Sequence, residues 1–174
     1  QRVADALRDI CRADLSIIFA GFASRGLQAG PITRRDLYQA LPGSTHVTAA
    51  DVSGAQIRRM VERMLASPYR TESFNPKRSA PPAGLPAVSG NVKLAYDLAR
   101  EPNNRLLECL INGQPLAPAR RYRLASTYFT LSDITDDPEY DFIGLEPGQE
   151  IEMLRAEDVL WEIMEEWVKA QGCI

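Results

Sequence analysis

The amino-acid sequence predicts an α+β fold, with helices near both ends of the chain and strands grouped between them. Amphipathic helices are expected over residues 2–12 and near the C-terminus, while short apolar runs occupy the middle. Such elements pack in layers, because each buries one apolar face against another. A length of 174 residues suits a single domain with its own core, which we place over residues 1–174.

The N-terminal region contains a helix followed by a short buried strand. Apolar residues recur at helical spacing within residues 2–12, with charged residues between them. The run from Leu15 to Ala20 is too short for a helix and stops at Gly21, so it predicts a buried strand. Residues 21–32 hold three glycines and one proline, and we expect a loop there.

Two further helices are marked by their N-caps. Thr33 precedes a short helix that reaches Leu41 and is stopped by Pro42-Gly43. A strand is expected over 45–52, and Ser53 caps the next helix. The apolar face of that helix consists of Ile57, Met60, Val61, Met64 and Leu65.

The second half of the chain is mostly strands. Residues 69–86 contain four prolines and few apolar residues, which predicts a long loop. Asn112-Gly113 is a strong hairpin signal, because both residues tolerate positive φ. The predicted strands are 92–96, 106–111, 122–127 and 150–155.

The last element is a helix that ends near Gly172. Its apolar face consists of Val159, Leu160, Ile163, Met164, Trp167 and Val168. Core packing is the expected role of Trp167, and docking of a second subunit through Trp161 and Trp167 is an alternative.

Composition limits the possible partners. A net charge of −3 and a pI near 5.3 give no electrostatic reason to expect nucleic acid. No apolar run approaches the ~20 residues of a membrane span. Three cysteines cannot all pair with one another and lack metal-ligand spacing, so we interpret them as buried or incidental thiols. The start at Gln1 rather than Met favours a processed or partial chain.

Catalysis by this chain alone is not expected. A two-metal phosphoesterase needs several His, Asp and Asn ligands, whereas the chain has one histidine, His46, on a predicted strand. No zinc spacing, Gly-x-Ser-x-Gly nucleophile or P-loop occurs. We therefore predict no catalytic residue, metal ligand or cofactor site here. A solvated acidic loop, rather than a calcium loop, is expected from Asp133, Asp136, Asp137, Glu139 and Asp141.

Short motifs follow one another in a characteristic order. They are Gly-Pro-Ile-Thr (30–33), Asp-Leu-Tyr-Gln-Ala-Leu-Pro (36–42), Val-Ser-Gly-Ala-Gln-Ile (52–57), Val-Ser-Gly (88–90), Leu-Ala-Tyr-Asp (94–97), Ile-Asn-Gly-Gln-Pro-Leu (111–116) and Tyr-Arg-Leu-Ala-Ser (122–126). This order resembles the C-terminal domain of the 5'-nucleotidase family, from about Ala13 to Phe142. The resemblance implies a four-layer α/β/β/α sandwich, with helices outside two packed sheets.

The resemblance also implies a function shared between two domains. An N-terminal metallophosphatase domain of the same polypeptide would bind two divalent metal ions and cut the phosphate ester of a nucleotide or a related compound. This chain would be the substrate-recognition domain and would bind the nucleoside part. Members of the family are commonly periplasmic or secreted, which is the location that the resemblance implies.

The ligand positions of the family match less well. Its arginine is replaced or shifted to Arg25, and one of the two rings that sandwich the base falls on Phe129. Its Gly-Gly-Asp turn is absent, and Asp133 is the nearest acid. Two further positions depart from the family: Phe19 lies near the turn asparagine, and Gly43 replaces the other ring. Arg25 could equally be a solvated loop charge, and Phe129 could equally be a core aromatic.

Loss of one stacking ring has a measurable consequence. Each base–aromatic contact contributes about 1–3 kcal/mol, so binding could weaken by up to about two orders of magnitude. Candidates for a replacement ring are Tyr128, Phe22 and Phe74. The alternative function is a non-enzymatic small-ligand-binding module that kept the fold and lost the nucleoside clamp.

Overall fold

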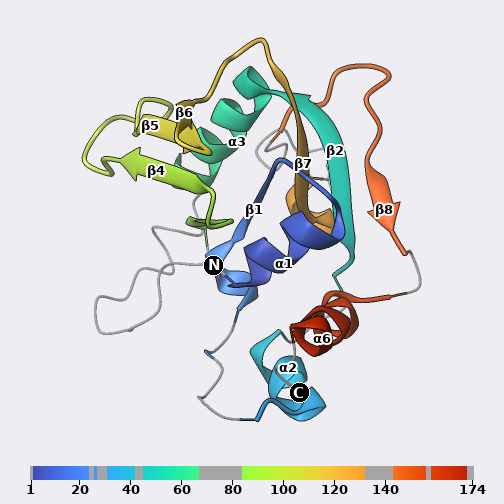
Figure 1. The fold of residues 1–174 in the computed structure, drawn as a ribbon. Coiled ribbons are helices and arrows are strands. Elements are labelled where there is room, and N and C mark those ends of the chain that lie inside the picture. Colours follow the sequence, from blue (N-terminus) through green and yellow to red (C-terminus); the bar gives the residue numbers. More distant parts are fainter. Residues whose placement is uncertain are drawn as a thin grey trace.

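Two β-sheets of different size organise the fold in the computed structural model of this protein (Figure 1). The structure describes residues 2–23, 26, 31–41, 45–66, 84–131, 143–155 and 158–171, with the side chain of residue 129 left out. Helices and strands both contribute substantially, and the predicted α+β class is confirmed.

The larger sheet has five strands in the order β3-β1-β7-β2-β8. Strands β1 and β7 are parallel, and the other neighbouring pairs are antiparallel. The five strands are β3 (Pro86–Val88), β1 (Leu15–Phe19), β7 (Arg121–Thr127), β2 (Val47–Ser53) and β8 (Glu152–Leu154).

The smaller sheet is antiparallel and has the order β4-β5-β6. Its strands are β4 (Val92–Tyr96), β5 (Leu106–Ile111) and β6 (Gln114–Pro115). The predicted turn joins β5 to β6, where Asn112 has a φ of 51° and Gly113 a φ of 76°. Glycine suits this left-handed position, because it has no Cβ.

Helices pack on both faces of the larger sheet (Figure 1). They are α1 (Arg2–Ile10), the 3-10 turn η1 (Ala20–Phe22), α2 (Arg34–Ala40), α3 (Gly54–Ala66), α5 (Tyr128–Leu131) and α6 (Leu160–Ala170). One core joins α1, α2 and α6 to one face of the sheet. A second core joins α3 and the smaller sheet to its other face.

The predicted N-caps of two helices are confirmed. The backbone N–H of Asp36 donates to the Thr33 hydroxyl at 3.2 Å, and that of Thr33 donates to the Asp36 carboxylate at 2.9 Å. Ser53 and Gln56 form the same reciprocal pair at the start of α3. A capping box satisfies two backbone donors that a helix start otherwise leaves unpaired.

Asn91 connects the two sheets through its side chain. Its Nδ2 donates to the carbonyl of Asp14 at 2.8 Å and to Oδ1 of Asn112 at 3.2 Å. Its Oδ1 accepts from the Ser89 hydroxyl at 2.8 Å and from Arg8 Nη1 at 3.2 Å. Helix α1, the start of β1 and the β5–β6 turn are therefore fixed to one another.

Two elements differ from the predictions. Residues 128–131 form α5, a helix that was not predicted, and Pro86–Val88 form β3 at the end of the predicted loop. Proline is compatible with β3, because this strand lies at the sheet edge and its residues need not all donate hydrogen bonds. Trp167 is partly buried against the α1–α2–α6 core, which confirms its packing role.

Several sequence predictions fall outside the described residues. They concern Arg25, Pro42-Gly43, most of the loop 69–86 with Phe74, the acidic loop from Asp133 to Asp141, and the helix end at Gly172. In the part of the chain that is described, no helix combines the length and apolar character required to cross a bilayer.

Candidate functional site

One edge of the larger sheet brings together the segments that carry the predicted ligand residues. The parallel strands β1 and β7 end there, at Phe19 and Thr127. Strand β2 is antiparallel to β7 and begins there, with Val47 beside Thr127. The segments after β1 and after β7 therefore start at this edge, and the segment before β2 ends there; we call it the loop edge.

The structure locates the predicted residues to different extents. Phe129 is the second residue of α5, directly after β7, and its backbone is described although its side chain is not. Arg25 and Asp133 lie outside the described residues, as does Gly43. Their described neighbours in sequence lie in the segments that start or end at the loop edge.

Aromatic rings differ in their access to the loop edge. The ring of Phe19 is 7% exposed and belongs to the core beneath α3, with the ring of Phe22 at 6.2 Å. A buried phenyl ring cannot supply the polar contact that the family's turn asparagine implies. Tyr128, at the start of α5, is 39% exposed and has a ring accessible to a ligand.

Backbone hydrogen bonds hold the segment before β2 in place. The Tyr128 N–H donates to the carbonyl of His46, and the Leu160 N–H donates to the carbonyl of Thr45, both at 2.9 Å. Residues 45 and 46 are therefore fixed to the first residue of α5 on one side and to the first residue of α6 on the other. His46 is half-buried, as expected for a partly packed residue.

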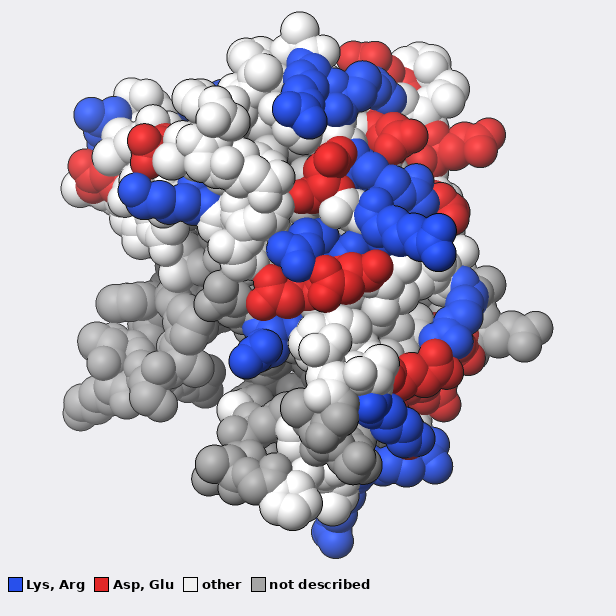
Figure 2. Space-filling view, viewed as in Figure 1, with Lys and Arg blue, Asp and Glu red and all other residues white. Residues whose placement is uncertain are grey.

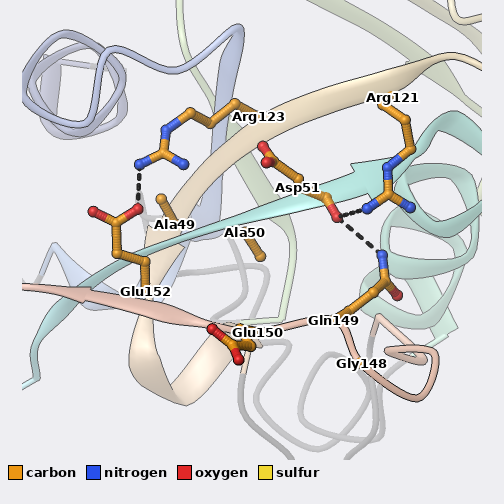
Figure 3. Close-up of a pocket in the computed structure, with 9 residues that line it drawn as sticks. All are labelled: Ala49, Ala50, Asp51, Arg121, Arg123, Gly148, Gln149, Glu150 and Glu152. Atoms are coloured by element: carbon orange, nitrogen blue, oxygen red, sulfur yellow. Dashed lines mark hydrogen bonds and ion pairs between the residues drawn. The ribbon is translucent and has the colours of Figure 1, made fainter.

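A second candidate is a hollow at the opposite end of β2 and β7 (Figure 3). Its volume is about 440 Å³, which falls within the usual range for small-molecule sites. It is lined by Ala49, Ala50, Asp51, Arg121, Arg123, Gly148, Gln149, Glu150 and Glu152.

One ion pair and two hydrogen bonds to a backbone carbonyl connect the polar groups of the hollow. Arg123 Nη2 donates to Glu152 Oε2 at 2.5 Å, and this hydrogen bond raises the pKa of the arginine. Arg121 Nη2 and Gln149 Nε2 both donate to the carbonyl of Asp51, at 2.5 Å and 2.9 Å (Figure 3). Figure 2 shows basic and acidic side chains interspersed over the face of the molecule that it draws. The hollow therefore offers a polar surface of mixed charge.

Catalytic chemistry is not evident in the described residues. Within the described ranges, no group of three or more His, Cys, Asp or Glu side chains could hold a metal ion. Among the described residues that line the hollow, there is no serine, cysteine or histidine. Sequence reasoning missed the hollow: Arg123 lies on the predicted strand 122–127, but Arg121 joins the same sheet face only because the strand begins one residue earlier than predicted.

Comparison with protein families gives a match over most of the chain. The family described as "5'-nucleotidase, C-terminal domain" matches residues 1–136. No curated protein matches the chain.

Solved structures share the fold. A 5'-nucleotidase precursor of Thermus thermophilus has a TM-score of 0.78 and 17% identity, over 99% of this chain and 32% of that one. NAD nucleotidase (NadN) of Haemophilus influenzae has a TM-score of 0.76 and 14% identity, over 98% of this chain and 29% of that one. The sulfate thiohydrolase SoxB of Thermus thermophilus, in complex with glycerol, has a TM-score of 0.65 and 22% identity, over 98% of this chain and 28% of that one. This chain spans about a third of the length of these proteins.

Proposed function

Because the chain belongs to the family of 5'-nucleotidase C-terminal domains, we propose that it is the substrate-recognition domain of a 5'-nucleotidase-like phosphoesterase. Its role is to bind the nucleoside part of a nucleotide, or the corresponding part of a related phosphate ester. The observation that carries the proposal is the family match over residues 1–136, which includes both strands that end at the loop edge.

The topology of the larger sheet supports a binding site at the loop edge. Ligand-binding residues are commonly carried by loops that a rigid scaffold positions. Here β1, β7 and β2 form that scaffold, and their hydrophobic residues lie in the two cores. Positions 25, 43 and 133 belong to the three segments that begin or end at this edge. A ligand bound there could contact all three segments together.

Each proposed ligand residue has a chemical role. The ring of Phe129 stacks on the base, and a single such contact contributes about 1–3 kcal/mol. The guanidinium of Arg25 donates hydrogen bonds to an anionic or polar group of the substrate. The carboxylate of Asp133 accepts hydrogen bonds from hydroxyl groups.

Hydrolysis itself is assigned to a separate domain of the same polypeptide, upstream of Gln1. Two divalent metal ions held there would activate water and stabilise charge on the phosphate ester. The described part of this chain has no cluster of ligands for them. Its own contribution to catalysis is to bind and orient the substrate, which lowers the entropic cost of reaching the transition state.

Calorimetric titration of the chain with AMP and adenosine tests the recognition role. We expect both ligands to bind, and Phe129→Ala to weaken both by about 10- to 100-fold. Tyr96→Ala is the matched control, because Tyr96 is a 37% exposed ring on the smaller sheet. Binding that is unaffected by Phe129→Ala, or equally affected by Tyr96→Ala, would contradict the proposed site.

A non-enzymatic ligand-binding module is the second candidate. Burial of the Phe19 ring favours it, because the polar contact expected near this position is missing. The fold is shared with a sulfate thiohydrolase, and a shared fold does not fix a substrate. Tight binding of a ligand without a phosphate ester, together with no binding of AMP or adenosine, would favour this candidate.

A further inference from the structure

Helix α5 carries position 129 at the loop edge, although it is only four residues long. A helix of one turn is not stable by itself, so contacts outside the helix must fix its orientation. The structure describes three such contacts: a pair of buried hydroxyls, a backbone hydrogen bond and a buried leucine.

The hydroxyl pair joins the residue before the helix to its third residue. Thr127 Oγ1 and Thr130 Oγ1 lie 2.7 Å apart, and the two residues are 0% and 1% exposed. Their spacing matches that of a capping box, with a hydroxyl in place of the usual carboxylate or amide. Removal of either hydroxyl would deprive the other of this hydrogen bond in a place that water does not reach.

The backbone hydrogen bond connects α5 to the segment before β2. Tyr128, the first residue of α5, donates its N–H to the carbonyl of His46 at 2.9 Å. Thr45 in turn accepts from the N–H of Leu160 at 2.9 Å. The start of α5 is therefore fixed to a segment that α6 also holds.

Burial fixes the rotation of α5 about its own axis. Thr130 and Leu131 are the last two residues of α5, and Thr127 is the residue directly before the helix. All three are at most 1% exposed, whereas Tyr128 is 39% exposed. The backbone of residue 129 therefore lies between Tyr128, which is hydrogen-bonded to His46, and the buried residues Thr130 and Leu131.

We propose that Thr127 and Thr130 are positioning residues of the ligand site, acting through Phe129. Their hydroxyl pair fixes the backbone of α5, which carries position 129, at the loop edge. They do not themselves contact the ligand. The inference rests on the proposed function, since it concerns the same binding site.

A double-mutant cycle on nucleotide binding tests whether the threonines act through Phe129. In the chain with Phe129 intact, we expect Thr127→Val to weaken AMP binding by about five- to tenfold, because the isosteric change removes only the hydroxyl. In the Phe129→Ala background the same change should alter the Kd by less than about twofold, since the group it positions is gone. Equal losses in the two backgrounds would overturn the proposal.

Two control variants separate positioning from general stability. Thr127→Ser keeps a hydroxyl and should restore AMP affinity. Thr48→Val removes another buried hydroxyl, on β2, which donates to the carbonyl of Ser126 at 3.4 Å. It should lower Tm without changing the Kd. An unchanged Kd in Thr127→Val, or a loss in Thr48→Val as large as in Thr127→Val, would also overturn the proposal.

A second readout works without any ligand. With 4-fluorophenylalanine incorporated, the fluorine resonance of residue 129 can be assigned by its loss in Phe129→Leu. We expect Thr127→Val and Thr130→Val to shift or broaden this resonance, and Thr127→Ser and Thr48→Val to leave it unchanged. An unmoved resonance in Thr127→Val would overturn the inference. If no nucleotide binds the unmodified chain, the proposed function fails, and the fluorine spectrum still decides the positioning role.

Discussion

The side-chain amide of Gln56 donates to the backbone carbonyl of Gly144 at 2.8 Å, and so connects the first turn of α3 to a segment 88 residues later. The same amide donates to Gln149 Oε1 at 2.7 Å, and Gln149 Nε2 donates to the carbonyl of Asp51 at 2.9 Å. Gln56 Oε1 also accepts from the Ser53 N–H at 2.9 Å. One buried glutamine thus caps a helix and holds one wall of the hollow in Figure 3.

Replacement of Gln56 should therefore destabilise the fold. Gln56 is 7% exposed, and Gln56→Ala leaves the carbonyl of Gly144 and the N–H of Ser53 without these partners. We expect a loss of about 1–3 kcal/mol in the free energy of unfolding, measured by denaturant titration. Gln114→Ala, on an exposed strand, should change it by less than about 0.5 kcal/mol. Similar values for the two variants would contradict the role of Gln56.

The close approach of Gly54 to the chain after β6 gives a second prediction. A Cβ at Gly54 would lie 2.2 Å from the carbonyl oxygen of Ala117 and 3.2 Å from the Cα of Pro118, both backbone atoms. Gly54→Ala should cost at least about 2 kcal/mol of unfolding free energy, despite the higher helix propensity of alanine. Gly26→Ala is the control, because no described atom lies within 4 Å of its Cβ position. An unfolding free energy of Gly54→Ala equal to that of the unmodified chain would contradict this close approach.

Burial of two thiols gives a pH-dependent prediction. Desolvation raises the pKa of Cys11 and of Cys109 from 9.0 to about 11 in the folded protein. Between these values the unfolded chain loses the thiol protons and the folded chain keeps them. The folded state therefore keeps its full stability relative to the unfolded state below pH 9, and the contribution of these thiols is lost as the pH rises toward 11. Each thiol should contribute a decrease of up to about 1.4 kcal/mol per pH unit.

Denaturant titrations at pH 8, 9 and 10 measure this effect. The variant Cys11→Ala/Cys109→Ala is the reference, since lysines and tyrosines titrate in the same range. The unmodified chain should lose stability with pH more steeply than the variant. Parallel pH profiles would show that the two thiols do not titrate differently in the folded and unfolded states.

The sequence predicted local structure well where short motifs determine it. Thr33 and Ser53 cap their helices because their hydroxyls accept hydrogen bonds from backbone groups three residues later. Asn112-Gly113 forms the predicted turn, because it tolerates positive φ. In each case the physical cause lies within a few residues of the motif.

Structure that depends on distant contacts was not predicted. Helix α5 is too short for a periodic pattern, and its first residue, Tyr128, is held by a hydrogen bond to His46, which is distant in sequence. The hollow also depends on a distant contact, since Gln149 reaches the carbonyl of Asp51 across 98 residues. Motif order gave the proposed ligand positions, but only the sheet topology shows that the strands beside them end or begin at one edge.

Phosphate release by the full-length protein, including the sequence upstream of Gln1, tests the central claim most directly. We predict that it releases phosphate from a nucleotide or a related ester. Phe129→Ala should raise KM by about 10- to 100-fold with kcat nearly unchanged, because the ring binds ground state and transition state alike. No phosphate release from any nucleotide or sugar-phosphate ester, or an unchanged KM in Phe129→Ala, would contradict the assignment of this chain as the substrate-recognition domain.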